Sequence, residues 1–150
     1  MTRAIKELEF LPFSFHEKLI RRESLMIPLM LWRTSAGFPS PAEDYIEARI
    51  DLNRELIRHP NSTFFARNGG ESMQNVGIYP DTLLVIDRAE NIVSGSVVVA
   101  RLENEFTVKR LWLKDGQIIL LPENDNFEPI EVKTEDFEIW GKVTYSINKM

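Results

Sequence analysis

The chain has 150 residues, of which 43% are hydrophobic and 27% are charged, a composition that suits one globular domain with some length left for an arm. It contains no cysteine, which excludes a thiol nucleophile, a disulfide framework and a cysteine-based zinc site, and fits a reducing cytoplasm. The formal net charge of −5 argues against non-specific binding to nucleic acid, because such binding generally uses a basic patch.

Residues 1–36 are expected to form an N-terminal arm. They contain six Lys/Arg and four Asp/Glu, a formal +2, whereas residues 37–150 contain twelve and nineteen, a formal −7. Charge attraction and the apolar residues of the arm favour its docking on the acidic body, and the alternative is a solvated tail. The arm is too short and irregular for a helix-turn-helix domain, so we expect no direct sequence-specific DNA binding.

Nothing in the sequence predicts a membrane segment. The longest apolar run, residues 25–32, is far shorter than the roughly 20 residues that span a bilayer, and it contains Pro28. Acidic and polar residues interrupt any signal-peptide core near the start of the chain. A cytoplasmic location is therefore expected.

The sequence predicts a linker over residues 33–41, followed by helical structure. Residues 33–41 are rich in small residues and proline, which is typical of an exposed, extended linker. The stretch Ser40-Pro41-Ala42-Glu43 has the form of a capping box, and Tyr45, Ile46 and Ile50 continue it at helical spacing. Asn53 is a candidate cap for a second short helix. One helix and two remain open alternatives for residues 42–58.

From Ser62 onwards the sequence predicts β-strands. Short β-branched stretches bounded by turn residues occupy residues 63–67, 83–87 and 96–101, and a further strand is predicted over 137–147. Asp115-Gly116 is a preferred hairpin pair. The fold class expected is therefore mostly β: a compact, mainly antiparallel domain over residues 37–150, with one or two short helices and an extended N-terminal arm.

A candidate catalytic pair lies within these strands and their turns. Ser72 follows Asn68-Gly69-Gly70-Glu71, and glycines suit a sharp turn that exposes backbone N–H groups beside the hydroxyl. Lys109 lies 37 positions later in a predicted strand, among apolar neighbours. A serine nucleophile needs a base, and a lysine can be that base when burial lowers its pKa. Either motif alone is also common in an ordinary turn or strand.

The sequence motifs around both residues have the order and spacing that are typical of one protein family. The stretches are Gly70-Glu71-Ser72-Met73 with Gly77-Ile78 and Asp81, Glu105-Phe106-Thr107-Val108-Lys109-Arg110-Leu111, and Leu120-Leu121-Pro122-Glu123-Asn124 with Pro129-Ile130. With them the chain, from about Ser35 to its C-terminus, closely resembles the LexA/UmuD family of self-cleaving Ser/Lys (S24-type) peptidases. Ala36-Gly37 matches the self-cleaved bond of that family, and residues 38–41 look more like UmuD than like LexA.

The resemblance implies a role for each of these residues. Ser72 would be the nucleophile, Lys109 the base, and the backbone N–H groups of Glu71 and Ser72 the oxyanion donors. Cleavage between Ala36 and Gly37 would remove residues 1–36. No cofactor and no metal is expected.

The resemblance also implies partners and a setting. A RecA–single-stranded DNA filament would stimulate cleavage during the SOS response to DNA damage. The processed homodimer would then serve a UmuC-like Y-family polymerase subunit in error-prone translesion synthesis. A LexA-like or signal-peptidase-like Ser/Lys protease acting on other proteins is one alternative, although a membrane anchor is not visible. A non-catalytic binding module of the same fold is the other.

The histidines and two of the tryptophans are expected to have structural positions. His16 and His59 are not spaced as a metal pair, and surface or helix-end positions are predicted for both. Trp112 and Trp140 are predicted to pack in the core or at a dimer contact.

Overall fold

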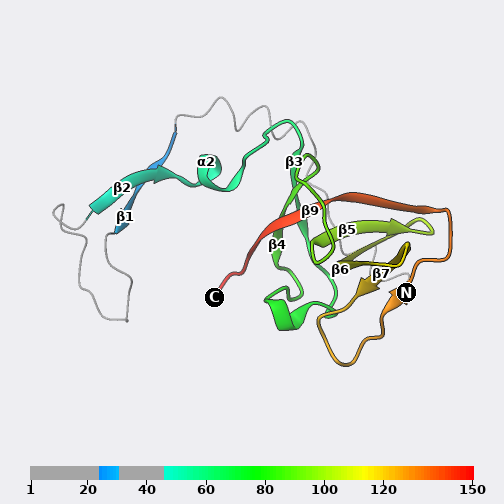
Figure 1. Ribbon diagram of the computed structural model, residues 1–150. Coiled ribbons are helices and arrows are strands. Elements are labelled where there is room, and N and C mark those ends of the chain that lie inside the picture. Colours follow the sequence, from blue (N-terminus) through cyan, green and yellow to red (C-terminus); the bar gives the residue numbers. More distant parts are fainter. Residues whose placement is uncertain (1–23, 31–45) are drawn as a thin grey trace.

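The computed structural model describes residues 24–30 and 46–150 (Figure 1). Ala36 and Gly37 lie outside the described residues, as do the predicted linker, His16 and most of the predicted arm. Within the described ranges, no helix is long and apolar enough to cross a membrane.

Seven antiparallel strands form the main sheet, in the order β3-β4-β9-β5-β6-β7-β8. Their bounds are β3 Thr63–Arg67, β4 Leu83–Asp87, β5 Val97–Leu102, β6 Glu105–Lys114, β7 Gln117–Leu121, β8 Ile130–Glu131 and β9 Phe137–Ile147. The predicted mostly antiparallel β fold is confirmed, and every stretch predicted to be a strand contributes one. The last strand in the sequence, β9, lies in the middle of the sheet between β4 and β5.

Two tight hairpins connect neighbouring strands. Asp115 and Gly116 join β6 to β7 with φ values of 51° and 75°. Glu103 and Asn104 join β5 to β6 with φ values of 50° and 65°. A type I′ turn requires positive φ values at both of its central residues. Such turns are favoured in hairpins because their twist matches that of the strands they join. The predicted Asp-Gly hairpin is therefore present.

The core lies on both faces of the central strands. Consecutive strand residues point to opposite faces, and the adjacent Val98 and Val99, both fully buried, belong to two different apolar clusters. The cluster around Val99 also contains Met73 and Ile78, which lie in the β3–β4 connection. Their burial anchors this connection, which carries Ser72, to the sheet.

A second, two-stranded sheet stands apart from the main sheet in Figure 1. In it, β1 (Met26–Met30) pairs antiparallel with β2 (Ile46–Asp51). The helical reading of Ile46 and Ile50 is therefore wrong, since both lie in β2. Residues four apart share a face in a strand as well as in a helix, so this spacing fits both, and the pairing with β1 decides for the strand.

One α-helix is present in the described part of the chain. It is α2 (Leu52–Leu56), and the Asp51 side chain accepts a hydrogen bond of 3.0 Å from the Asn53 N–H. The predicted cap at Asn53 is thus wrong: the helix begins at Leu52, and the Asp51 side chain supplies the capping oxygen. A single 3-10 turn, η2 (Gln74–Val76), follows the turn that carries Ser72, which is called the serine turn below.

Candidate active site

Ser72 lies in the β3–β4 connection, just before η2. Met73, which is 1% exposed and belongs to the core cluster around Val99, fixes the turn in the core. The left-handed residue here is Gly77, with φ 80°, whereas Gly70 has no positive φ and a Cβ there would meet nothing within 4 Å. The chain turns over residues 71–74, where the Gln74 N–H donates to the Glu71 carbonyl at 3.3 Å, so the turn that carries Ser72 forms without a left-handed glycine at position 70.

Lys109 reaches Ser72 from β6. The Nζ of Lys109 lies 2.7 Å from the Oγ of Ser72, a hydrogen-bonding distance. The lysine is only 7% exposed, and its neighbours along the strand include the buried Val108 and Leu111. The structure thus brings together the two residues that the sequence predicts to form a catalytic pair.

The burial of Nζ makes the charged form of the amine less favourable than it is in water. It donates to the Thr107 hydroxyl at 2.8 Å and to the Val108 carbonyl at 3.2 Å. Burial, which penalises the charged form, lowers the pKa of Lys109 from 10.5 to about 8. A neutral amine has two N–H bonds for these two acceptors, and its lone pair can then accept a proton from Ser72.

Residues that follow β7 form hydrogen bonds with the serine turn. The N–H of Glu123 donates to the carbonyl oxygen of Ser72 at 2.7 Å, and its own carbonyl accepts from the Asn75 N–H at 2.8 Å. The carboxylate of Glu123 pairs with the Nε of Arg110 at 2.5 Å, and Arg110 also donates to the Gly95 carbonyl. The third sequence stretch of the resemblance, residues 120–124, therefore contacts the turn directly.

Comparison with known protein families matches residues 28–144 to "Peptidase S24-like". The chain belongs to this family. The Peptidase S24-like assignment supports a hydrolase of the serine-peptidase kind. The matched range contains Ser72 and Lys109, as well as Ala36 and Gly37.

Whole-chain comparison agrees with the Peptidase S24-like assignment. The chain is 46% identical over 122 residues to Protein SamA of Salmonella typhimurium, covering 81% of this chain and 85% of the relative. It is 45% identical over 123 residues to Protein MucA of Escherichia coli, covering 81% and 84%. It is 44% identical over 127 residues to Protein ImpA of Shigella flexneri, covering 85% and 87%. These relatives are UmuD-like proteins, so the resemblance noted in the sequence is confirmed.

Sequence reasoning missed several contacts of the site. Thr107 carried a usable signal, because it lies two residues before Lys109 and so shares its strand face. The contacts of Glu123 and Asn124 had no such signal, since both lie in an irregular loop. Trp140 packs edge-on against Phe106 with ring centroids 4.8 Å apart, as its predicted packing role requires, whereas Trp112 is 44% exposed.

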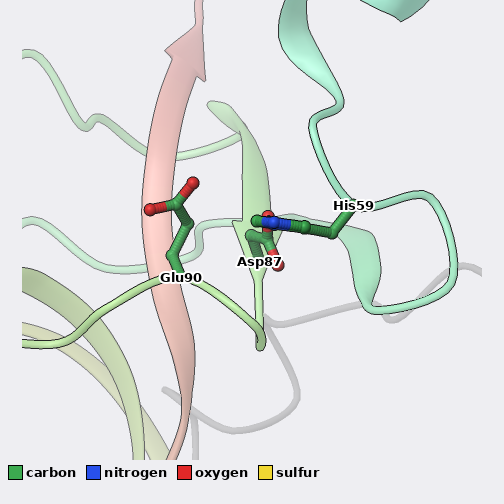
Figure 2. A group of neighbouring side chains, drawn as sticks. All are labelled: His59, Asp87 and Glu90. Atoms are coloured by element: carbon green, nitrogen blue, oxygen red, sulfur yellow. The ribbon is translucent and has the colours of Figure 1, made fainter.

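His59 belongs to a separate cluster with Asp87 and Glu90 (Figure 2). Its Nδ1 lies 2.6 Å from an Asp87 carboxylate oxygen, and one potential ligand atom from each residue lies within 4.8 Å of the others. The other Asp87 oxygen accepts from the Ser62 hydroxyl and the Ala89 N–H, and Glu90 pairs with Arg58. These groups already form hydrogen bonds and an ion pair with protein groups. We therefore interpret the cluster as a structural contact, called the clasp below, between residues 57–62 and the end of β4.

The clasp also determines the charge state of Asp87. Burial by itself would raise the pKa of this carboxyl, but hydrogen bonds from His59, Ala89 and Ser62 outweigh that effect and lower the pKa below its usual 3.8. Asp87 is therefore held as a buried carboxylate at neutral pH.

Proposed function

We propose that the protein is a self-processing serine peptidase that cleaves its own Ala36–Gly37 bond. The observation that carries this proposal is the 2.7 Å contact between the Ser72 hydroxyl and a buried lysine amine. Membership of the Peptidase S24-like family supports it.

In the proposed reaction, the Oγ of Ser72 attacks the carbonyl carbon of Ala36 as Lys109 takes the hydroxyl proton. The N–H groups of Glu71 and Ser72 stabilise the oxyanion. The C–N bond to Gly37 then breaks, and Lys109 gives its proton to the departing amine. Water hydrolyses the resulting ester and restores Ser72.

The position of the bond in the chain favours an intramolecular reaction. Ala36 and Gly37 lie in segment 31–45, which joins the paired strands β1 and β2. The substrate is therefore tethered on both sides, and a tethered reactant has a high effective concentration. Each chain also carries only one such bond, so the reaction is a single turnover.

The proposal extends to partners through the UmuD-like relatives. A RecA–single-stranded DNA filament stimulates cleavage by favouring the docked position of the bond, without adding a catalytic group. The processed product, residues 37–150, acts as a homodimer and as accessory subunit of a UmuC-like Y-family polymerase in translesion synthesis during the SOS response. The location is cytoplasmic, where these partners are.

Purified protein is expected to split only between Ala36 and Gly37, faster with the filament than without it. Intact mass and N-terminal sequencing should show a large product that begins Gly37-Phe38-Pro39. Single-stranded DNA without RecA is the control and should not stimulate. A product beginning elsewhere would refute the assigned bond. No cleavage even with filament would favour a non-catalytic binding module, and cleavage of added proteins alone would favour a peptidase acting in trans.

The cleavage rate without filament is expected to rise with pH through about 8 and then to level off, because only the neutral amine of Lys109 accepts the proton. At pH 7, one unit below that pKa, roughly a tenth of the plateau rate should remain. A pH–rate profile from about pH 6 to 10 measures this. A flat profile, or a rise centred near about pH 6.5 as for a histidine base, would contradict the lysine assignment.

A further inference from the structure

The two peptide groups on either side of Glu71 each accept a hydrogen bond, at the carbonyl oxygen, from an asparagine side chain. A trans peptide group is planar, with its C=O and N–H pointing in opposite directions. The described residues contain no cis peptide bond. A hydrogen bond that fixes the carbonyl oxygen of one residue therefore also fixes the direction of the next residue's N–H.

Asn68 holds the first of these groups. Its Nδ2 donates to the carbonyl oxygen of Gly70 at 2.8 Å and to that of Tyr79 at 3.0 Å. Asn68 is 7% exposed, and its own N–H and C=O bond to Thr82 and Asp81 at 2.9 and 2.7 Å. The amide is thus fixed to the chain just before β4. It sets the plane of the Gly70–Glu71 peptide and hence the direction of the Glu71 N–H.

Asn124 holds the second group. Its Nδ2 donates to the carbonyl oxygen of Glu71 at 2.8 Å, a shorter bond than the one of 3.3 Å that the same oxygen accepts from the Gln74 N–H. Asn124 therefore contributes the shorter of the two bonds that set the direction of the Ser72 N–H. Its Oδ1 accepts from the Asn126 N–H at 3.0 Å, so the oxygen is engaged there and the NH₂ must face Glu71. The adjacent bond from the Glu123 N–H to the Ser72 carbonyl, at 2.7 Å, holds the same loop against the turn.

The two N–H groups fixed in this way remain available. Neither the N–H of Glu71 nor that of Ser72 has a hydrogen-bond acceptor among the described residues. Donors that stabilise a developing oxyanion act best when they are already oriented and unoccupied. A peptide group whose carbonyl oxygen accepted no hydrogen bond would rotate more freely. Its N–H would then have to be reoriented during the reaction.

We propose that Asn68 and Asn124 are positioning residues that preset the two oxyanion donors, Glu71 N–H and Ser72 N–H, through the opposite ends of their peptide groups. This inference rests on the proposed function. It also gives a role to the loop after β7: Asn124 contributes to the reaction without touching the substrate.

Asn124 offers the sharper test, because it lies in a surface loop whereas Asn68 is buried. Asn124→Asp keeps the shape and the oxygen that receives the Asn126 N–H, but it cannot donate to Glu71. Both Asn124→Asp and Asn124→Ala are expected to lower the plateau cleavage rate about ten-fold or more, since losing an oxyanion donor outright costs about a hundred-fold or more. In Asn124→Ala the pH midpoint should stay near 8, because the surroundings of Lys109 are unchanged. Asp125→Ala, a change at the exposed neighbour, should cleave like wild type.

A second measurement separates this inference from the proposed function. A fluorophosphonate probe forms a bond from phosphorus to the Ser72 Oγ, releases fluoride and places a phosphoryl oxygen where the oxyanion would lie. The lysine takes the hydroxyl proton, and no arm is required. Labelling rates by intact mass should fall as the cleavage rates do. If the wild type is labelled but does not cleave itself, the proposed function fails, and the labelling ratio still decides the role of Asn124. Variants that cleave or label within two-fold of wild type would overturn the inference, as would a loss in Asn124→Ala that comes entirely from a shifted pH midpoint.

Discussion

Ser72→Ala and Lys109→Arg are each expected to abolish cleavage of the Ala36–Gly37 bond, with a loss of at least about a thousand-fold. Alanine removes the attacking oxygen. Arginine keeps its charge throughout the accessible pH range, so it cannot accept the serine proton, although it retains the positive charge of the lysine. The 2.7 Å contact makes the two residues a unit, and the double variant should therefore lose little more than either single one.

Product formation over time, with and without filament, measures these losses by intact mass. Lys114→Arg is the matched control, because Lys114 lies on the same strand but is exposed, and this variant should cleave at the wild-type rate. Thermal unfolding should confirm that each variant is folded. Filament-dependent cleavage in Lys109→Arg would mean that another group is the base.

Replacing the buried lysine with an apolar residue of similar length is expected to stabilise the fold. The pKa of Lys109 falls from 10.5 to about 8, and each unit corresponds to about 1.4 kcal/mol, so the charged amine costs up to about 3 kcal/mol below pH 8. Lys109→Met removes that cost but leaves the acceptors around Nζ unpaired. A gain of about 1–3 kcal/mol in the free energy of unfolding at pH 7 is therefore expected.

The pH dependence of this gain follows from the direction of the shift. Between pH 8 and 10.5 the unfolded chain binds a proton at Lys109 that the folded chain has lost, so the lysine-containing protein becomes more stable as pH rises. The advantage of Lys109→Met should shrink across this window. Urea unfolding at pH 7 and pH 10, with both proteins also carrying Ser72→Ala to prevent cleavage, measures it. A gain that does not change with pH would show that desolvation of the amine is not its source.

The strands and the contact between Ser72 and Lys109 could be predicted from the sequence because their signals are local. Asp115-Gly116 specifies its own turn, and Ser72 and Lys109 each lie in a recognisable stretch. Ile46 and Ile50 misled because a four-residue spacing repeats in both helix and strand, and only the pairing with β1 resolves it. The bond from Asn124 to Glu71 joins residues 53 apart through one side chain in an irregular loop, and no periodicity reports such a contact.

The central place of β9 has a consequence for the newly made chain. In the main sheet, β3 and β4 carry the turn with Ser72, while β5 to β8 carry Lys109, and β9 is the strand that joins the two groups. A ribosome releases residues 137–147 after all the others described in the sheet, and chains emerge at only about 5–20 residues per second. Ser72 and Lys109 therefore reach their final distance only after residues 137–147 have been made. The proposed self-cleavage would therefore begin only after β9 has joined the sheet.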